Sequence, residues 1–182
     1  MALMKKRSVA WVVFAICVVF SLLFSGGRAL FDKRNDTTAV FFDKGVEGDG
    51  LCIKRDVIQR GECAYNLAGV AANYPAVDKA LVTAAQSAST QVSEARSIPE
   101  FRQANDACQR AVEDLYTVLS NMSLSEKDRS FALKQYDEFQ SRGSAISRDG
   151  FNEKARTFNH DRNQFPANLL AQLTGVKEVD LF

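Results

Sequence analysis

The stretch DGFNEKARTFNHDRNQFPANLLA, residues 149–171, carries the repeat that decides the fold. Phe151, Phe158 and Phe165 recur in it at a spacing of seven residues. Two turns of an α-helix take about seven residues, so side chains at this spacing lie nearly one above another on a single stripe of the helix. The repeat therefore predicts one side of a helical bundle core, with these three phenylalanines packed on it.

Pro166 and Leu169 follow the repeat and mark how it ends. Pro166 ends or kinks the helix, because proline lacks the backbone N–H that a continuing helix needs. Leu169 belongs to a last amphipathic turn or two that stop at Gly175. Together with the three phenylalanines, Pro166 and Leu169 form the structural motif that we assign to the end of the chain.

Upstream of this motif, apolar residues recur at three- and four-residue steps, which is the period of an amphipathic helix. Helices are expected over residues 51–72 and 76–97, from Ser97 to about residue 120, and from Ser123 to residue 165. Ser97 precedes Pro99 and Glu100, and Ser123 precedes Glu126, so both serines are expected to cap helices. The sequence thus predicts an all-α fold, an antiparallel bundle of about four long helices.

The N-terminus contains a long run without any charged residue: VAWVVFAICVVFSLLFSGG, residues 9–27. About 20 apolar residues in a helix cross the hydrocarbon core of a bilayer, about 30 Å thick, so the run predicts a transmembrane helix. A cleavable signal peptide is the alternative, because small residues end the run, although the run is long for one. The predicted divisions are a basic tail (1–8), the transmembrane anchor (9–27), a connector (28–50) and the helical bundle domain (51–182).

Basic residues flank both ends of the apolar run, with Lys5, Lys6 and Arg7 before it and Arg28, Lys33 and Arg34 after it. Positively charged flanks tend to stay in the cytoplasm, and the two flanks here nearly balance. The free amino terminus tips the balance toward a cytoplasmic N-terminus. The bundle is then expected on the extracytoplasmic side.

Composition and cysteine usage argue against several classes of ligand. The 23 basic and 22 acidic residues leave a net charge of +1, which gives no basic excess for binding nucleic acid. Cys52, Cys63 and Cys108 form no CxxC pair, and His160 is the only histidine, so neither a metal site nor a cofactor is expected. Any disulfide is expected to join Cys108 to Cys52 or Cys63, because residues 52 and 63 lie about 16 Å apart on one continuous helix.

The sequence also lacks the common catalytic motifs, including the nucleophile elbow, the phosphate-binding loop and paired histidines. His160 and Asp161 are adjacent, and neighbouring helical side chains point about 100° apart, so they do not form a base with its orienting partner. We therefore expect no catalytic residues and no enzymatic activity.

Four asparagines are the candidate binding residues: Asn66, Asn152, Asn159 and Asn168. Asparagine is unfavourable inside a helix, so its presence there calls for a hydrogen-bonding reason. One interpretation is that these side chains bond across helices or cap the broken backbone near Pro166. The other is that they line a site for a polar ligand or a protein partner.

The end of the chain resembles the C-terminal signature of the LemA family, in which tyrosine–asparagine pairs repeat before a Phe-Pro-x-Asn-Leu ending. The matching positions are Phe151-Asn152, Phe158-Asn159, Phe165-Pro166 and Asn168-Leu169, with phenylalanine in place of the family's tyrosines. A weaker match at residues 59–67 is similar to the family's Arg-Arg-x-Asp-Leu-Ile-Pro-Asn-Leu helix start, and keeps Arg60, Glu62 and Asn66-Leu67.

The resemblance implies a single-pass protein of the bacterial plasma membrane with an antiparallel helical bundle and no assigned catalytic activity. Two functional classes fit this expectation. The first is a membrane-anchored scaffold or interaction module at the cell envelope, with a role in membrane organisation and an unknown protein partner. The second is an extracytoplasmic sensor or ligand-binding domain. The sequence does not separate them, and it leaves open whether the chain forms a homo-oligomer.

Overall fold

The structure of the protein is a computed structural model that describes residues 2–182, apart from the side chains of residues 2–6, Ser8 and Leu22. Two units can be separated by their internal contacts. We call Met1–Thr38 with Glu153–Val179 the anchor unit, and Ala39–Asn152 with Asp180–Phe182 the bundle unit. The two units are described separately below.

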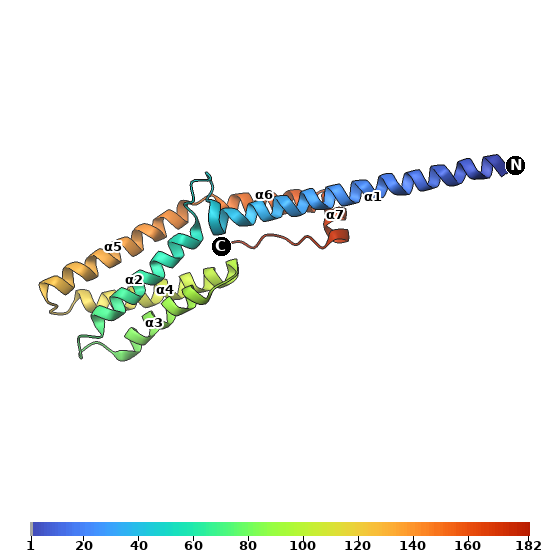
Figure 1. Ribbon diagram of the computed structural model, residues 1–182. Coiled ribbons are helices and arrows are strands. Elements are labelled where there is room, and N and C mark those ends of the chain that lie inside the picture. Colours follow the sequence, from blue (N-terminus) through green and yellow to red (C-terminus); the bar gives the residue numbers. More distant parts are fainter. Residues whose placement is uncertain (1) are drawn as a thin grey trace. The chain divides into compact units, whose positions relative to one another are not determined.

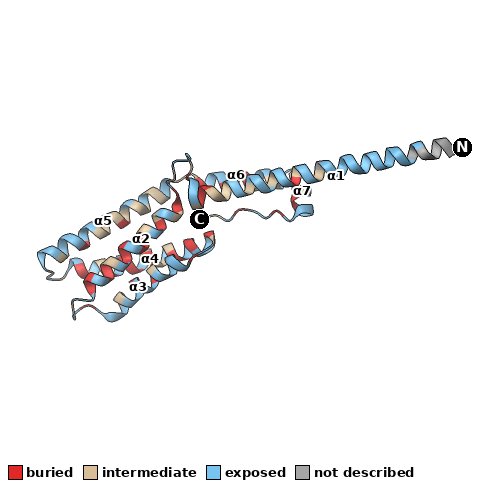
Figure 2. Cartoon of the chain, viewed as in Figure 1, coloured by how far each residue is buried: buried red, intermediate tan, exposed pale blue. Residues whose placement is uncertain are grey.

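Four long helices form the bundle unit and lie side by side (Figure 1). They are α2 (Ile53–Ala71), α3 (Lys79–Glu94), α4 (Ile98–Ser120) and α5 (Glu126–Arg148). Helix α2 packs against each of the other three, and the buried side chains gather on the facing sides of the helices (Figure 2). The expected all-α bundle of about four long helices is confirmed.

The start of α4 matches the predicted cap. The Ser97 hydroxyl accepts a hydrogen bond from the Glu100 N–H, and the Glu100 carboxylate accepts bonds from the N–H groups of Arg96 and Ser97. The bond from the Arg96 N–H and those from Ser97 lower the pKa of Glu100. Reciprocal bonding of this kind satisfies N–H groups that the first helical turn leaves free.

The start of α5 differs from the prediction, because Ser125 caps the helix and not Ser123. The Ser125 hydroxyl accepts a bond from the Asp128 N–H at 3.1 Å. Tyr74, from the turn after α2, fixes this choice: its hydroxyl donates to the Asp128 carboxylate at 2.6 Å and accepts from the Ser125 N–H at 3.0 Å. A distant tyrosine therefore selects one of two serines that the local sequence makes equally suitable.

The long helix expected from residue 123 to 165 is interrupted. Helix α5 ends at Arg148, and a new helix, α6 (Phe151–Asn163), begins after Asp149 and Gly150. The Asp149 side chain accepts a bond from the Phe151 N–H at 2.7 Å, and the Asp149 backbone is extended. This bond replaces a helical one, so the chain leaves α5 and starts again. A short helix, α7 (Ala167–Thr174), follows and ends at Gly175 in the left-handed conformation, as expected.

The N-terminal helix is longer than predicted. Helix α1 (Ala2–Ala39) continues into a π-helical turn, η1 (Val40–Lys44), so the first part of the expected connector is helical and only residues 45–52 are irregular. Among the described residues, Val9–Lys44 is the one helical stretch long and apolar enough to cross a membrane, with a mean hydropathy of 2.5 in its most apolar window. The large apolar side chains described in its first part are exposed (Figure 2).

In the anchor unit, α6 and α7 lie alongside α1 (Figure 1). A Cβ atom built on Gly26 would lie 2.9 Å from Leu170 of α7, and one built on Gly27 would collide with Thr174. The two glycines therefore allow α7 to approach α1 closely. The large buried side chains of this unit come from α6 and from the chain after α7: Phe158, Val176 and Val179.

Candidate functional site

Two of the predicted asparagines, Asn152 and Asn159, form hydrogen bonds with the last residues, 176–182, which we call the C-terminal tail. In the anchor unit, the Asn159 amide nitrogen donates to the Val179 carbonyl at 2.9 Å, and its oxygen accepts from the Val179 N–H at 2.8 Å. The side chain thus pairs with both backbone groups of one residue, as a neighbouring strand would. Val179 is buried, so these bonds satisfy polar groups that water does not reach.

Asn152 makes the same pair of bonds within the bundle unit. Its amide nitrogen donates to the Phe182 carbonyl at 2.8 Å, and its oxygen accepts from the Phe182 N–H at 2.9 Å. Seven helical residues rise about 10.5 Å, and three extended residues cover about 10 Å. Asparagines seven residues apart on α6 can therefore pair with tail residues three apart, which accounts for the asparagine half of the repeat.

Other polar side chains of the anchor unit hold the tail as well. Arg162 of α6 donates to the Val176 carbonyl at 3.0 Å, and Arg34 of α1 donates to the Lys177 carbonyl at 3.0 Å. The tail is therefore bonded from both α1 and α6. Lys33 of α1 also pairs with Asp161 of α6 at 2.8 Å, and this hydrogen bond lowers the pKa of the exposed Asp161 carboxyl.

The two remaining asparagines have local or interhelical partners. Asn66 of α2 donates to the side-chain oxygen of Gln135 on α5 at 2.9 Å, which is a bond between helices. The Asn168 side-chain oxygen accepts from the N–H of the next residue, Leu169, at 2.7 Å, close to Pro166. The structure therefore does not gather the four asparagines into one cluster. Sequence reasoning missed the tail as a partner, although its hydrophobic step of three, Val176, Val179 and Phe182, was visible.

Replacing Asn159 with alanine should lower the free energy of unfolding by about 1–3 kcal/mol, because the buried Val179 backbone loses both of its side-chain partners. Asn168→Ala is the matched control, since the one bond of its side chain among the described residues is local, from the adjacent Leu169 N–H. Urea denaturation of both variants measures the difference. Equal, near-zero changes would mean that the tail does not depend on Asn159.

The phenylalanine half of the repeat does not form one stripe. Phe151 and Phe158 are buried, but Phe165 is 82% exposed and Leu169 is 48% exposed. The prediction is wrong at Phe165, because α6 ends at Asn163 and the helical period no longer applies beyond it. Phe151 is buried in the bundle unit and Phe158 in the anchor unit, so the two serve different cores.

Phe151 belongs to an aromatic cluster centred on Phe41, which the sequence analysis left in the connector. The Phe41 ring centroid lies 5.3 Å from that of Phe151, 5.7 Å from Phe101 and 5.4 Å from Phe182. Phe41 itself is fully buried. The cluster therefore joins η1, α4, α6 and the last residue of the chain within the bundle unit.

Arg60 of α2 is a buried charged residue, only 3% exposed. Its guanidinium donates to the side-chain oxygens of Asn105 and Gln109 on α4 and lies 3.9 Å from the centroid of the Phe139 ring on α5. Burial lowers the pKa of Arg60, because the charged form loses its water. The residue links α2 to α4 and α5, and it occupies the position that matched the weaker sequence signature.

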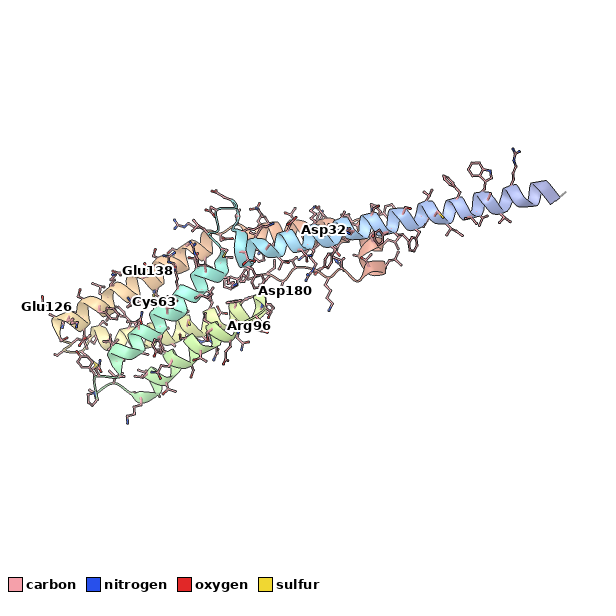
Figure 3. The ribbon with its side chains drawn as sticks, viewed as in Figure 1. Asp32, Cys63, Arg96, Glu126, Glu138 and Asp180 are labelled. Atoms are coloured by element: carbon pink, nitrogen blue, oxygen red, sulfur yellow. The ribbon has the colours of Figure 1, made fainter. Side chains whose placement is uncertain are left out.

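The cysteines of the bundle unit are buried free thiols. Cys63 lies on α2, and Glu138 lies on α5, which packs against α2 (Figure 3). Burial raises the pKa of both Cys63 and Cys108 to about 11, so both remain protonated and weakly nucleophilic at neutral pH. Helix α2 is continuous through Gly61, which keeps Cys52 and Cys63 apart as expected. The disulfide partner of Cys108 stays a prediction.

His160 and Asp161 are exposed neighbours on α6. Asp161 is held by Lys33 at 2.8 Å, and no hydrogen bond between Asp161 and His160 occurs among the described residues.

One groove in the bundle unit has a polar lining and a volume of about 440 Å³. Arg102, Asp106 and Arg110 of α4 form one wall, and Asp180 and Leu181 of the tail form the other. Figure 3 shows Asp180 on the tail. Side chains of both charges meet here, so the groove can bind a polar or zwitterionic group by complementary contacts.

The chain was compared with known protein families, curated proteins and solved structures. No curated protein and no solved structure matches the chain. The LemA family model matches residues 52–182, which include the four bundle helices, α6, α7 and the tail with its two asparagine partners. Because this match covers well over half of the sequence, the chain belongs to the LemA family.

Proposed function

We propose that the chain is a single-pass membrane protein whose helical bundle acts as a scaffold or interaction module at the cell envelope, with a role in membrane organisation and no catalytic activity of its own. The apolar stretch within α1 supports the membrane anchor. Membership of the LemA family supports the same architecture.

The scaffold proposal depends on one observation: the candidate binding residues form hydrogen bonds within the protein itself. The side-chain amides of Asn152 and Asn159 each donate one hydrogen bond to the tail backbone and accept one from it. Asn66 bonds to a neighbouring helix. Arg60 is likewise committed to side chains of α4. Polar groups that a ligand site would need are thus engaged in hydrogen bonds that hold the fold within each unit, which suits a protein that presents a surface.

The groove between α4 and the tail favours a second candidate, a sensor or ligand-binding domain. Its volume of about 440 Å³ lies in the range of small-molecule sites, roughly 300–1,000 Å³. Arg102 and Arg110 would contact an anionic part of the ligand, and Asp106 and Asp180 a cationic part.

A crosslinking experiment in intact membranes separates the two candidates. A photoreactive residue replaces Gln103, which lines the groove, in the full-length chain, and the same residue at exposed Thr83 on α3 serves as the control. The scaffold proposal predicts a discrete protein adduct specific to position 103, and an adduct of twice the chain's mass would identify a homo-oligomer. A small molecule retained on the purified protein, and lost in Arg102→Ala, would favour the sensor and contradict the scaffold.

We also propose that the N-terminus is cytoplasmic and the bundle extracytoplasmic. Lys5, Lys6 and Arg7 before the apolar run nearly balance Arg28, Lys33 and Arg34 after it, and the free amino terminus tips the balance toward a cytoplasmic N-terminus. The opposing Lys5 and Lys6 side chains lie outside the described residues, and Arg7 is exposed.

Protease added to spheroplasts should therefore digest the bundle while the apolar run stays protected. The measurement is an immunoblot with antibodies against the bundle, before and after the membrane is opened with detergent. A cytoplasmic protein serves as the control for membrane integrity. Full protection of the bundle until detergent is added would place it in the cytoplasm instead.

A further inference from the structure

Three large apolar side chains are exposed together around α7. Phe165 is 82% exposed, Leu173 61% and Leu169 48%. Leu169 and Leu173 are four residues apart on α7, so they lie on one face of the helix. Ala171, on the other side, is 1% exposed. Helix α7 therefore buries one face within the anchor unit and leaves an apolar face uncovered.

The position of α7 along α1 decides what covers this face. Helix α7 meets α1 at Gly26 and Gly27, through Leu170 and Thr174. These glycines are the last residues of the uncharged run that begins at Val9. A run of this length rises about 28 Å, close to the roughly 30 Å of a hydrocarbon core, so Gly26 and Gly27 reach one face of the bilayer.

The composition and charge of this segment fit the same surface. Residues 165–175, FPANLLAQLTG, contain no charged side chain, so none has to lose its water on entering the interface. Charged residues return directly after Gly27, with the ion pair of Arg28 and Asp32, and the pair of Lys33 with Asp161 lies six residues beyond Gly27, about 9 Å further along α1 and thus in the aqueous layer.

We propose that Phe165 and the exposed face of α7 insert into the bilayer surface beside α1, so that lipid covers Phe165, Leu169 and Leu173. Interfacial helices of this kind bury their apolar side about 5–10 Å into the headgroup and acyl boundary. The inference rests on the proposed anchoring by α1. It gives the protein a second membrane contact from the far end of its sequence, which fixes the direction of α6 relative to the bilayer.

Tryptophan fluorescence in vesicles tests this contact with the full-length chain. The sequence contains one tryptophan, Trp11, within the apolar run. In the Trp11→Phe background, Phe165→Trp and, separately, Leu169→Trp place a single reporter on the proposed surface. The vesicles contain phosphatidylcholine that is brominated either near the headgroup or near the end of the acyl chain, because bromine quenches tryptophan on contact.

We expect quenching at both positions, stronger with the shallow bromine than with the deep one. Thr157→Trp in the same background is the control: Thr157 is exposed on α6, about 6 Å further from the membrane than Asp161, and should not be quenched. The wild-type chain tests the anchor separately through Trp11. Quenching of Trp11 without quenching at positions 165 and 169 would overturn this inference alone, whereas no quenching of Trp11 would overturn the proposed anchor.

Discussion

Replacing Phe158 with alanine should lower the free energy of unfolding by about 3–5 kcal/mol, which is the usual loss when a buried phenylalanine leaves a cavity. Phe158 is only 1% exposed, and its unit has few other large buried side chains to fill the space. The same replacement one repeat later, Phe165→Ala, should change stability by no more than about 0.5 kcal/mol in water, because that side chain is 82% exposed. Phe158 and Phe165 hold equivalent positions in the sequence repeat, but the losses of unfolding free energy on their replacement are expected to differ several-fold.

Urea denaturation of the fragment of residues 28–182 measures both changes. The fragment begins after the apolar run and keeps the part of α1 that carries Lys33 and Arg34, which bond to α6 and the tail. Both variants should unfold with an unchanged slope, since neither alters the area exposed on unfolding by much. Equal midpoints for Phe158→Ala and the wild type would contradict the buried position of Phe158.

The parts of the fold that sequence reasoning predicted depend on local patterns. Each bundle helix repeats apolar residues at the helical period, and Ser97 with Glu100 is a cap that needs only its own neighbours. Gly175 ends α7 for an equally local reason, because it adopts a left-handed backbone that other residues avoid. Such features can be predicted before any tertiary contact is known.

The features that were missed depend on residues distant in sequence or on a single side-chain bond. Ser125 replaces Ser123 as a cap because Tyr74 bonds next to it, and α5 stops because the Asp149 carboxylate captures one N–H. The repeat predicts a buried Phe165 only if the helix continues to that residue, but α6 ends at Asn163. None of these outcomes leaves a periodic trace in the sequence.

The candidate asparagines illustrate the same limit. The spacing of seven between Asn152 and Asn159 suggests a helical role, but the spacing of three between their partners, Val179 and Phe182, belongs to a non-helical segment. Matching the two periods requires knowing that the tail runs along α6. The amide side chains could therefore be identified as candidates from sequence, whereas their partners could not.

Replacing Phe41 with alanine should cost the bundle unit about 3–5 kcal/mol, the loss expected for a fully buried phenylalanine. Phe41 contacts the rings of Phe42, Phe101, Phe151 and Phe182, with centroid distances of 4.9, 5.7, 5.3 and 5.4 Å. Pairs at these distances add about 0.5–1.5 kcal/mol each to the effect of burial, so the value should fall in the upper part of that range.

Phe131→Ala is a suitable control on the same unit, because Phe131 is 42% exposed and forms none of the ring contacts made by Phe41. Its loss should be well below that of Phe41→Ala. Urea denaturation of residues 28–182 compares the two, with circular dichroism to follow the helices. If both variants lose the same stability, Phe41 is no more buried than Phe131 and the cluster does not form.

A double-mutant cycle then tests whether the cluster holds the end of the chain. Phe182 is bound both by the Phe41 ring and by the Asn152 amide, so Phe182→Ala removes the ring and leaves the two backbone bonds to Asn152 in place. The coupling free energy between Phe41→Ala and Phe182→Ala should be about 0.5–1.5 kcal/mol, the range for a direct aromatic pair. Strictly additive losses would mean that the two rings do not touch, and the last residue would then be held by Asn152 alone.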